Sequence, residues 1–406
     1  MEKKNKPIKH YFKNTFIFII LTIIILFSID KLFLQSINLK LLKEQRVNYL
    51  STLKDKEPIY VGVVWPFHLK EGDNYFKEGI LFAVKSLNAQ KLLGREIKVI
   101  FKDDKWKIKQ AKKIANKFAN NKKIVAVIAH DDIDLAVPAS ITYEYSGIVM
   151  ISPAVSSPIF TKINFDYVFR NTPSDIEIGQ KLAMMADIMN FKKIVVINAR
   201  DIYAQSLSEV FRQEVLERNL EIIYDSRFNK GEKNFLKIIN TLSPLINHNI
   251  DYDAIFVAGN ETDVPILIKK ARENGIYAPF ITGDVLDSPA LLKIGEAANN
   301  TIVATIYNAE LISSTLQNFK HDFHKEYKVL PDTWAVQGYD AMMLLAEAIK
   351  RANTLHPAII ANQLQYMSNF KSITGSYSLT PKGDTLNKEV YFKVIKNQKF
   401  EYLTIE

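Results

Sequence analysis

The chain of 406 residues contains no cysteine. This excludes disulfide bridges, cysteine-ligated metals, thiol catalysis and a lipid carried on an N-terminal cysteine. Glycine and proline are scarce, at 14 residues each, and the sequence has no G-x-G-x-x-G, phosphate-binding-loop, G-x-S-x-G or H-E-x-x-H pattern. These absences remove the usual signatures of nucleotide-dependent enzymes, serine hydrolases and zinc proteases. We therefore expect no enzymatic activity and no cofactor.

Positive charge is concentrated at one end of the chain. Residues 1–56 hold 11 lysines and arginines against 4 acidic residues, so they account for +7 of the formal net charge of +9. The remaining 350 residues carry only +2. Because the body of the chain is nearly neutral, nucleic acid is not expected as its partner.

The N-terminal residues have the pattern of a membrane-targeting segment. A lysine-rich stretch is followed by the apolar run TFIFIILTIIILFSI, and no small residues suited to signal cleavage come after it in good register. The apolar character continues to residue 34 if two intervening charged side chains reach the membrane interface. A cleaved secretory signal is the alternative. We predict a cytoplasmic tail (1–14), a single-pass signal-anchor in the cytoplasmic membrane (15–34), a helical stalk (35–57) and an extracytoplasmic body.

From residue 58 onward, short apolar runs alternate with segments of helical periodicity. Strands that alternate with helices of this length predict parallel sheets with both faces covered. Two such series, separated near residues 171–174, predict an α/β fold of two Rossmann-like lobes. The expected strands are 59–64, 96–104, 124–129, 148–152, 193–199, 220–228, 253–259, 279–284 and 301–308, and the expected helices include 76–90, 107–121, 206–220, 234–246 and 263–275.

Polar and aromatic side chains occur where many of these predicted strands end. In open α/β sheets, ligands bind beyond the carboxyl ends of the strands, in the crevice between the halves. We therefore predict that the segments 65–67, 130–134, 152–157, 201–203, 259–260 and 283–284 converge on one cleft. Within them, Trp65, Asp131, Asp132 and Asn260 are candidate ligand-binding residues. Trp106 and Trp334 are interpreted as packing residues.

The loop HDDID at residues 130–134 is open to several interpretations. His130 beside clustered aspartates could ligate a metal, but a catalytic metal needs further ligands from other strand ends, and no second histidine is near them. His321 and His324 share a helical face, yet they lack a third defined ligand, so a solvated face is favoured. We therefore predict no metal site.

Several stretches occur in a characteristic order and spacing. They are GREIKVIFKDD, GIVMISPAVSSPIFT with YVFRNTPSD, FVAGNETDVPILIKKARENG with PFITGD, and WAVQGYDAMMLLAEAIKRA with ITGSYSLTPKGD. Together they resemble type I periplasmic solute-binding proteins, in particular the branched-chain amino-acid-binding or receptor ligand-binding-region type, over roughly residues 57–406. The resemblance implies three crossovers, near 171–174, 303–307 and 374–377, that divide the body into a first lobe (58–171 plus 306–374) and a second lobe (172–305 plus 375–406).

The resemblance also implies a ligand site. Relatives that bind amino acids hold the ligand carboxylate with hydroxyl and backbone groups, and its ammonium with an acid of the second lobe. Asp284 matches that acid, Tyr203 a cleft tyrosine, and Val155 and Ser156 the ligand-facing part of the Ser-Pro segment. The serine run that usually holds the carboxylate falls on residues 133–135, which read Ile-Asp-Leu and offer no hydroxyl donor.

This departure favours a cationic or multiply hydroxylated ligand near Asp131 and Asp132, with Trp65, Phe67 and Tyr203 as aromatic walls. The alternative is that the two aspartates only cap the following helix. The resemblance implies an extracytoplasmic protein that closes on a small ligand and presents it to a membrane permease. A membrane-anchored sensing ectodomain, or a scaffold that acts through a signalling partner, is the other class that the N-terminal anchor allows.

Overall fold

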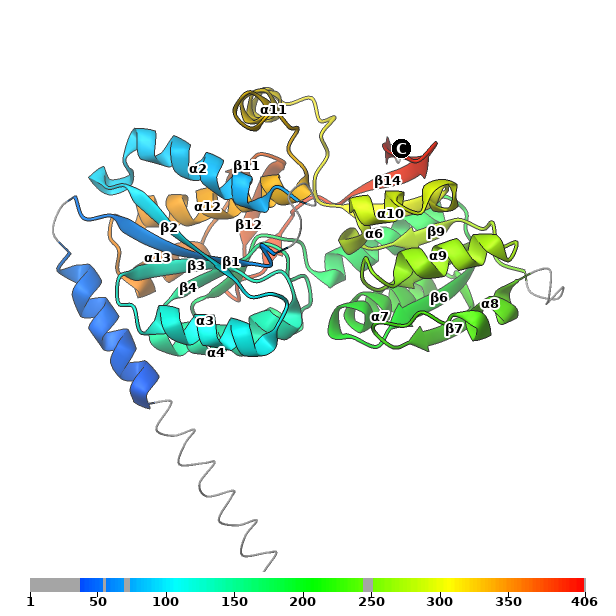
Figure 1. Ribbon diagram of the computed structural model, residues 1–406, viewed down its shortest axis with the longest axis horizontal. Coiled ribbons are helices and arrows are strands. Elements are labelled where there is room, and N and C mark those ends of the chain that lie inside the picture. Colours follow the sequence, from blue (N-terminus) through cyan, green and yellow to red (C-terminus); the bar gives the residue numbers. More distant parts are fainter. Residues whose placement is uncertain (1–36, 54–55, 69–73, 244–250, 405–406) are drawn as a thin grey trace, which may run out of the picture.

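The computed structural model describes residues 37–53, 56–68, 74–243 and 251–404. They form two α/β lobes that lie side by side along the long axis of the molecule (Figure 1). Each lobe contains a sheet with helices packed on it, and most neighbouring strands in both sheets run parallel. The prediction of two α/β lobes with parallel sheets is confirmed.

The sheet of the first lobe has five parallel strands in the order β2-β1-β3-β4-β5. All residues of its central strand, IVAVIA, are buried, because helices α2, α12 and α13 cover one face of the sheet and α3 and α4 cover the other. The strands are β1 (Ile59–Trp65), β2 (Ile97–Asp103), β3 (Ile124–Ala129), β4 (Val149–Ser152) and β5 (Val168–Arg170). The helices are α2 (Phe76–Gln90), η1 (Leu92–Gly94), α3 (Ile108–Ala119), α4 (Ile133–Ser146), α5 (Ile159–Lys162), α11 (Ser314–Tyr327), α12 (Thr333–Ala352) and α13 (Pro357–Gln365).

The sheet of the second lobe has seven strands in the order β15-β14-β10-β9-β8-β6-β7. The strands from β10 to β7 pair in parallel, and the last two strands of the chain add an antiparallel edge. The strands are β6 (Lys193–Ala199), β7 (Glu221–Phe228), β8 (Ala254–Ala258), β9 (Phe280–Thr282), β10 (Thr301–Thr305), β14 (Tyr391–Lys396) and β15 (Lys399–Leu403). The helices are α6 (Asp175–Ile188), α7 (Ile202–Glu217), α8 (Leu236–Leu242), α9 (Val264–Glu273), η2 (Asp284–Leu286), α10 (Pro289–Leu292) and η3 (Gly295–Ala298).

The chain passes between the lobes after β5, after β10 and before β14. We predicted the third passage near residues 374–377, with 375–406 in the second lobe. This boundary is wrong, because Tyr377 and Leu379 are buried in the core of the first lobe. They belong to a small antiparallel sheet that packs there, so the passage lies between β13 and β14. That sheet consists of β11 (Phe370–Ser372), β12 (Gly375–Leu379) and β13 (Thr385–Leu386).

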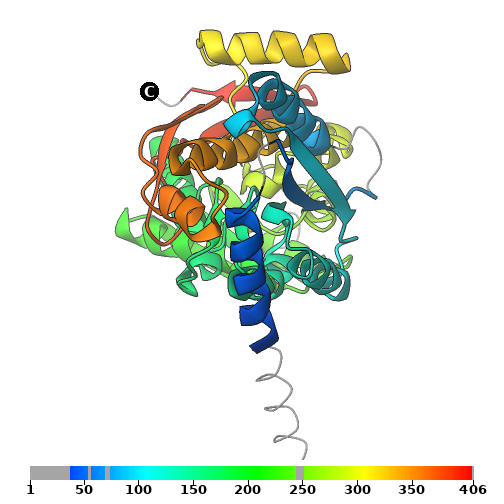
Figure 2. The same ribbon diagram turned by 90° about the vertical axis from the view of Figure 1, so that its left-hand side faces the viewer.

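Residues 37–51 form a helix on the outer end of the first lobe, away from the second lobe (Figures 1 and 2). We predicted a stalk over residues 35–57, and its described part is indeed helical. It does not extend freely from the body, however, because Leu39, Leu50 and Arg46 are buried against the first lobe. The helix is therefore part of the folded lobe.

The predicted cytoplasmic tail (1–14) and transmembrane anchor (15–34) lie outside the described residues. Among the residues that the structure does describe, no helix is both long enough and apolar enough to cross a bilayer.

Candidate ligand-binding site

A cavity of about 510 Å³ lies between the two lobes. Its walls come from the segments that follow β1, β3 and β4 in the first lobe and β6, β8 and β9 in the second, which is where open α/β sheets bind ligands. The eight residues predicted to bind a ligand all line this cavity, so their predicted convergence is found; their contact with a ligand stays a prediction. They are Trp65, Asp131, Asp132, Val155, Ser156, Tyr203, Asn260 and Asp284.

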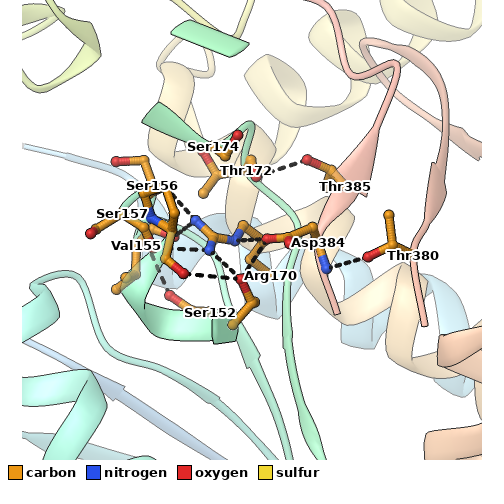
Figure 3. A network of polar contacts seen from close by, with 12 residues as sticks. Ser152, Val155, Ser156, Ser157, Arg170, Thr172, Ser174, Thr380, Asp384 and Thr385 are labelled. Atoms are coloured by element: carbon orange, nitrogen blue, oxygen red, sulfur yellow. Dashed lines mark hydrogen bonds and ion pairs between the residues drawn. The ribbon is translucent and has the colours of Figure 1, made fainter. Parts of the chain in front are cut away.

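The wall between β4 and α5 is held from behind by Arg170, which is fully buried at the end of β5 (Figure 3). Its Nη1 donates to the carbonyl oxygens of Val155, at 2.9 Å, and Ser156, and its Nη2 donates to that of Ser157 at 2.9 Å. Its Nε pairs with Asp384 Oδ1 at 2.9 Å. Because trans peptides point N–H and C=O in opposite directions, the N–H groups of Ser156 and Ser157 point away from the guanidinium. The Ser157 hydroxyl lines the cavity and has no hydrogen-bond partner among the described residues.

Asp132 begins helix α4 as its N-cap, and its side chain accepts the N–H of Asp134 at 2.7 Å. Asp132 therefore caps the helix, as the alternative interpretation expects, but it also lines the cavity. The second oxygen of Asp132 lies 3.5 Å from the ammonium of Lys230, which belongs to the other lobe. Much of the negative charge that the sequence places here is thus met by a cation of the protein itself.

Asp131 has a different role. One of its carboxylate oxygens accepts the indole N–H of Trp106, and the other is buried without a partner among the described residues. Burial raises the pKa of Asp131 well above its usual range, and the negative charge of Asp104 adds to this effect. The capping alternative is wrong for Asp131, which lines the cavity instead.

The second-lobe wall is built around Asp284, which follows β9. The Tyr203 hydroxyl, from the start of α7, donates to Asp284 Oδ1 at 3.1 Å. This approach requires glycine at position 283, because a Cβ there would overlap the Tyr203 hydroxyl oxygen and lie 2.6 Å from Leu207 Cδ2. Burial raises the pKa of Asp284 to about 6, although the hydrogen bond from Tyr203 acts in the opposite direction.

A second acid, Asp175, lies beside this wall at the start of α6. It is fully buried, and its backbone N–H donates to the carbonyl of Ser156 at 2.9 Å, which places it where the two lobes meet. Burial raises its pKa to about 7, against the opposing effect of nearby Ser206 and Ser156 hydroxyls, and the charge of Asp284 raises it further. Two acids with raised pKa values beside one cavity are typical of a functional site.

Aromatic rings close one end of the cavity. Trp65 is 3% exposed and stacks on Phe76 with ring centroids 3.9 Å apart, while Trp334 lies against it at 5.4 Å. The Trp65 indole N–H has no partner among the described residues. The prediction that Phe67 forms a wall is wrong, because it packs on Phe101 and does not line the cavity.

His130 is buried behind this loop and pairs with an acid. Its Nδ1 lies 2.7 Å from Asp104 Oδ2, and both side chains are fully buried. Among the described residues, no group of three or more histidine, aspartate or glutamate side chains is arranged to hold a metal ion. The pair therefore supports the loop from within.

Sequence reasoning missed several lining residues. Trp106 and Trp334, interpreted as packing residues, both line the cavity, and Trp106 is 42% exposed. Trp106 follows the end of β2, so the rule that located the other candidates applies to it as well. Lys230 also lines the cavity, and Asp175 is buried beside it. Neither gave a local signal, because Lys230 sits in a lysine-containing turn and Asp175 in the first turn of a helix.

Comparisons with known proteins agree with this architecture. A family model described as periplasmic binding protein matches residues 58–399. The Leu/Ile/Val-binding protein homolog 1 of Brucella abortus (strain 2308) is 28% identical over 319 residues, which cover 76% of this chain and 82% of that protein.

Solved structures show the same fold. The ABC transporter substrate-binding protein of Desulfitobacterium hafniense, in complex with Leu, has a TM-score of 0.78 at 30% identity, covering 86% of this chain and 100% of that chain. The branched-chain amino acid transporter substrate-binding protein LivJ of Streptococcus pneumoniae, in complex with isoleucine, has a TM-score of 0.75 at 24% identity, covering 85% of this chain and 98% of that chain. The chain therefore belongs to the type I periplasmic binding proteins, of the branched-chain amino-acid-binding type.

Proposed function

We propose that the chain is an extracytoplasmic solute-binding protein that captures a small, polar, amino-acid-like ligand between its lobes and presents it to an ABC-type permease. Relatives described as substrate-binding proteins of ABC transporters support this class, and two of them are complexes with leucine or isoleucine. The observation that carries the proposal is the pairing of unlike walls across one cavity. Ser156 and Ser157 of the first lobe and Asp284 of the second lobe line this cavity, and the buried acid Asp175 lies beside it.

The two walls suit the two poles of an amino acid. The N–H groups of Ser156 and Ser157 and the Ser157 hydroxyl are donors for a carboxylate. Asp284 is an acceptor for an ammonium, and a bound cation would offset the unfavourable desolvation of its charge and of the nearby charge of Asp175. Val155, Asn260 and the Trp65 ring complete the proposed contacts.

Hinge closure follows from this arrangement. A ligand that touches both walls gains its full contacts only when the lobes are close together, so binding shifts the population toward the closed state. The partner permease would then recognise the closed shape. No covalent chemistry is required, and the relatives carry binding-protein descriptions.

Attachment to the membrane is part of the proposal. The lysine-rich tail and the apolar segment 15–34 would anchor the chain in the cytoplasmic membrane, since no cysteine is present to carry a lipid. An alternative function is a sensing or scaffold role at the membrane. It is supported by the helix at residues 37–51, which packs against the first lobe and directly follows the N-terminal segment in sequence. In that alternative the body is a ligand-sensing ectodomain or a non-binding scaffold that acts on a protein partner.

The test is a thermal-stability screen of the full chain, purified in detergent, against amino acids, polyamines, sugars and carboxylates. A ligand present at 100 times its Kd stabilises the native state by about 2.7 kcal/mol, a shift of several degrees. Asp284→Asn should abolish the shift, whereas Asp322→Asn, on the exposed face of α11, should leave it unchanged. No shift with any compound would contradict solute binding and favour the scaffold.

A further inference from the structure

The unpaired oxygen of Asp131 is a feature of the cavity that an apolar ligand would leave unexplained. One oxygen of this carboxylate is taken by the Trp106 indole N–H, and Oδ1 is buried with no partner among the described residues. Asp131 lines the cavity. Buried carboxylates that lack a donor are costly, so this oxygen marks a position where a donor from a ligand fits.

The charges around Asp131 also favour a positively charged group of the ligand at this position. The groups that act most strongly on it besides Trp106 are the acids Asp104 and Asp132, and none of them is a cation. Lys230, the cation on the opposite wall, pairs with Asp132 at 3.5 Å. Its charge acts on Asp132, Asp134 and Asp201, whereas Asp131 has no counterion among the described residues.

Two further buried polar groups belong to residues that line the same cavity and lack a hydrogen-bond partner among the described residues. The Ser157 hydroxyl and the Trp65 indole N–H belong to residues that are 1% and 3% exposed, and neither has a hydrogen-bond partner among the described residues. They are independent of the acidic loop, because they follow other strands. The cavity therefore offers polar groups at three separate positions: donors at the serine wall, an acid at Asp284 and an acid at Asp131.

We propose that the ligand is a basic amino acid, whose side-chain cation meets Asp131. This inference rests on the proposed function, because it assigns the α-carboxylate and α-ammonium groups to the serine wall and to Asp284. The Trp106 indole, 42% exposed at the rim, both orients the carboxylate and offers an aromatic face to the alkyl part of the side chain. A leucine-like side chain would instead leave Asp131 desolvated and unpaired.

The test compares lysine with norleucine, which differs from it only by the side-chain ammonium, by titration calorimetry of the full chain in detergent. Arginine, ornithine and leucine extend the series. We expect lysine, ornithine or arginine to bind at least tenfold more tightly than norleucine. Asp131→Asn should remove most of this preference while norleucine binding changes little. Asp284→Asn should weaken both ligands, because the α-ammonium is common to them.

Trp106→Phe provides a second variant, because it keeps an aromatic ring at this position but removes the indole N–H that orients Asp131. We expect it to lose less of the preference for lysine over norleucine than Asp131→Asn does. Asp322→Asn is the matched control, and a melting curve for each variant checks folding. Equal or tighter binding of norleucine or leucine would overturn the basic-ligand inference and leave the proposed function intact. Absence of binding by every amino acid would instead count against the proposed function.

Discussion

Arg46 is predicted to hold the N-terminal helix on the first lobe, and its replacement tests this directly. The side chain is fully buried, and among the described residues its guanidinium donates only to backbone carbonyl oxygens. Those oxygens belong to the last turns of α3 and α4, to the turn after α3 and to the first residue of β3. The acceptors are Phe118 at 3.1 Å, Ala119 at 2.8 Å, Asn121 at 3.1 Å, Ile124 at 3.0 Å and Ser146.

The loss of stability expected for Arg46→Ala follows from the carbonyl groups that lose their hydrogen-bond donor. Carbonyl groups at helix C-termini lack a hydrogen-bond donor within the helix and carry a partial negative charge. The buried guanidinium supplies both the missing donors and a compensating positive charge. Burial lowers the pKa of Arg46 to about 10, which measures the opposing cost of desolvation. Removing one partner of such a buried, charged network costs about 3 kcal/mol. With an unfolding entropy of about 2.1 cal/mol/K per residue over roughly 350 residues, Arg46→Ala should lower Tm by about 4 °C.

Arg46→Lys should fall between the wild type and Arg46→Ala, because an ammonium keeps the charge but cannot reach all of these acceptors at once. Lys40→Ala is the matched control, since Lys40 is exposed on the same helix. Hydrogen exchange should show slow amides in residues 37–51 of the wild type and fast ones in Arg46→Ala. A variant that melts within 1 °C of the wild type with its helix still protected would refute the reasoning.

Three further predictions concern the cavity and its surroundings. The pKa of Asp175 is raised from 3.8 to about 7 in the folded state, so the folded chain binds more protons than the unfolded chain between these pH values, and its stability falls as pH rises through them. Asp175→Asn should therefore be more stable than the wild type by up to roughly 4 kcal/mol at neutral pH, and parallel curves of Tm against pH for the two proteins would contradict this. Gly283→Ala should displace Tyr203 from Asp284 and weaken ligand binding about tenfold or more, with unchanged affinity as the contrary result. Lys230→Met should change the free energy of unfolding by less than about 1 kcal/mol, because the ion pair of Lys230 with Asp132 is partly exposed. A loss of more than about 1 kcal/mol that persists at high salt would show that the pair is stronger than a surface ion pair.

The fold could be predicted from sequence because its signals are local. Runs such as IVAVIA are apolar on every residue, which is expected only for strands covered on both faces, and strand ends can be read from the same pattern. The third passage between lobes could not be placed in this way. Tyr377 and Leu379 alternate as in any half-buried strand, and this pattern does not say which lobe buries them.

The site was predicted where it depends on strand ends and missed where it depends on contacts distant in sequence. Asp131 and Asp132 are adjacent and chemically identical, so no local pattern separates their roles. They differ because Trp106 reaches one of them from the end of β2, while the other meets the free N–H groups of α4 and the ammonium of Lys230. Arg46 was likewise invisible, because its acceptors lie 72 to 100 residues away.

The cavity wall and the passages between the lobes are held by the same side chains, which would couple ligand binding to the proposed closure of the lobes. Gln337 of α12 donates to the carbonyl of Pro153 in the wall at 2.8 Å, and its Oε1 accepts from Lys388 of the third passage at 3.0 Å. Arg170 links the same wall to Asp384, just before that passage. A rotation of the second lobe therefore pulls on the residues that shape the cavity. A ligand that fits only one arrangement of the wall biases the hinge, without any separate relay.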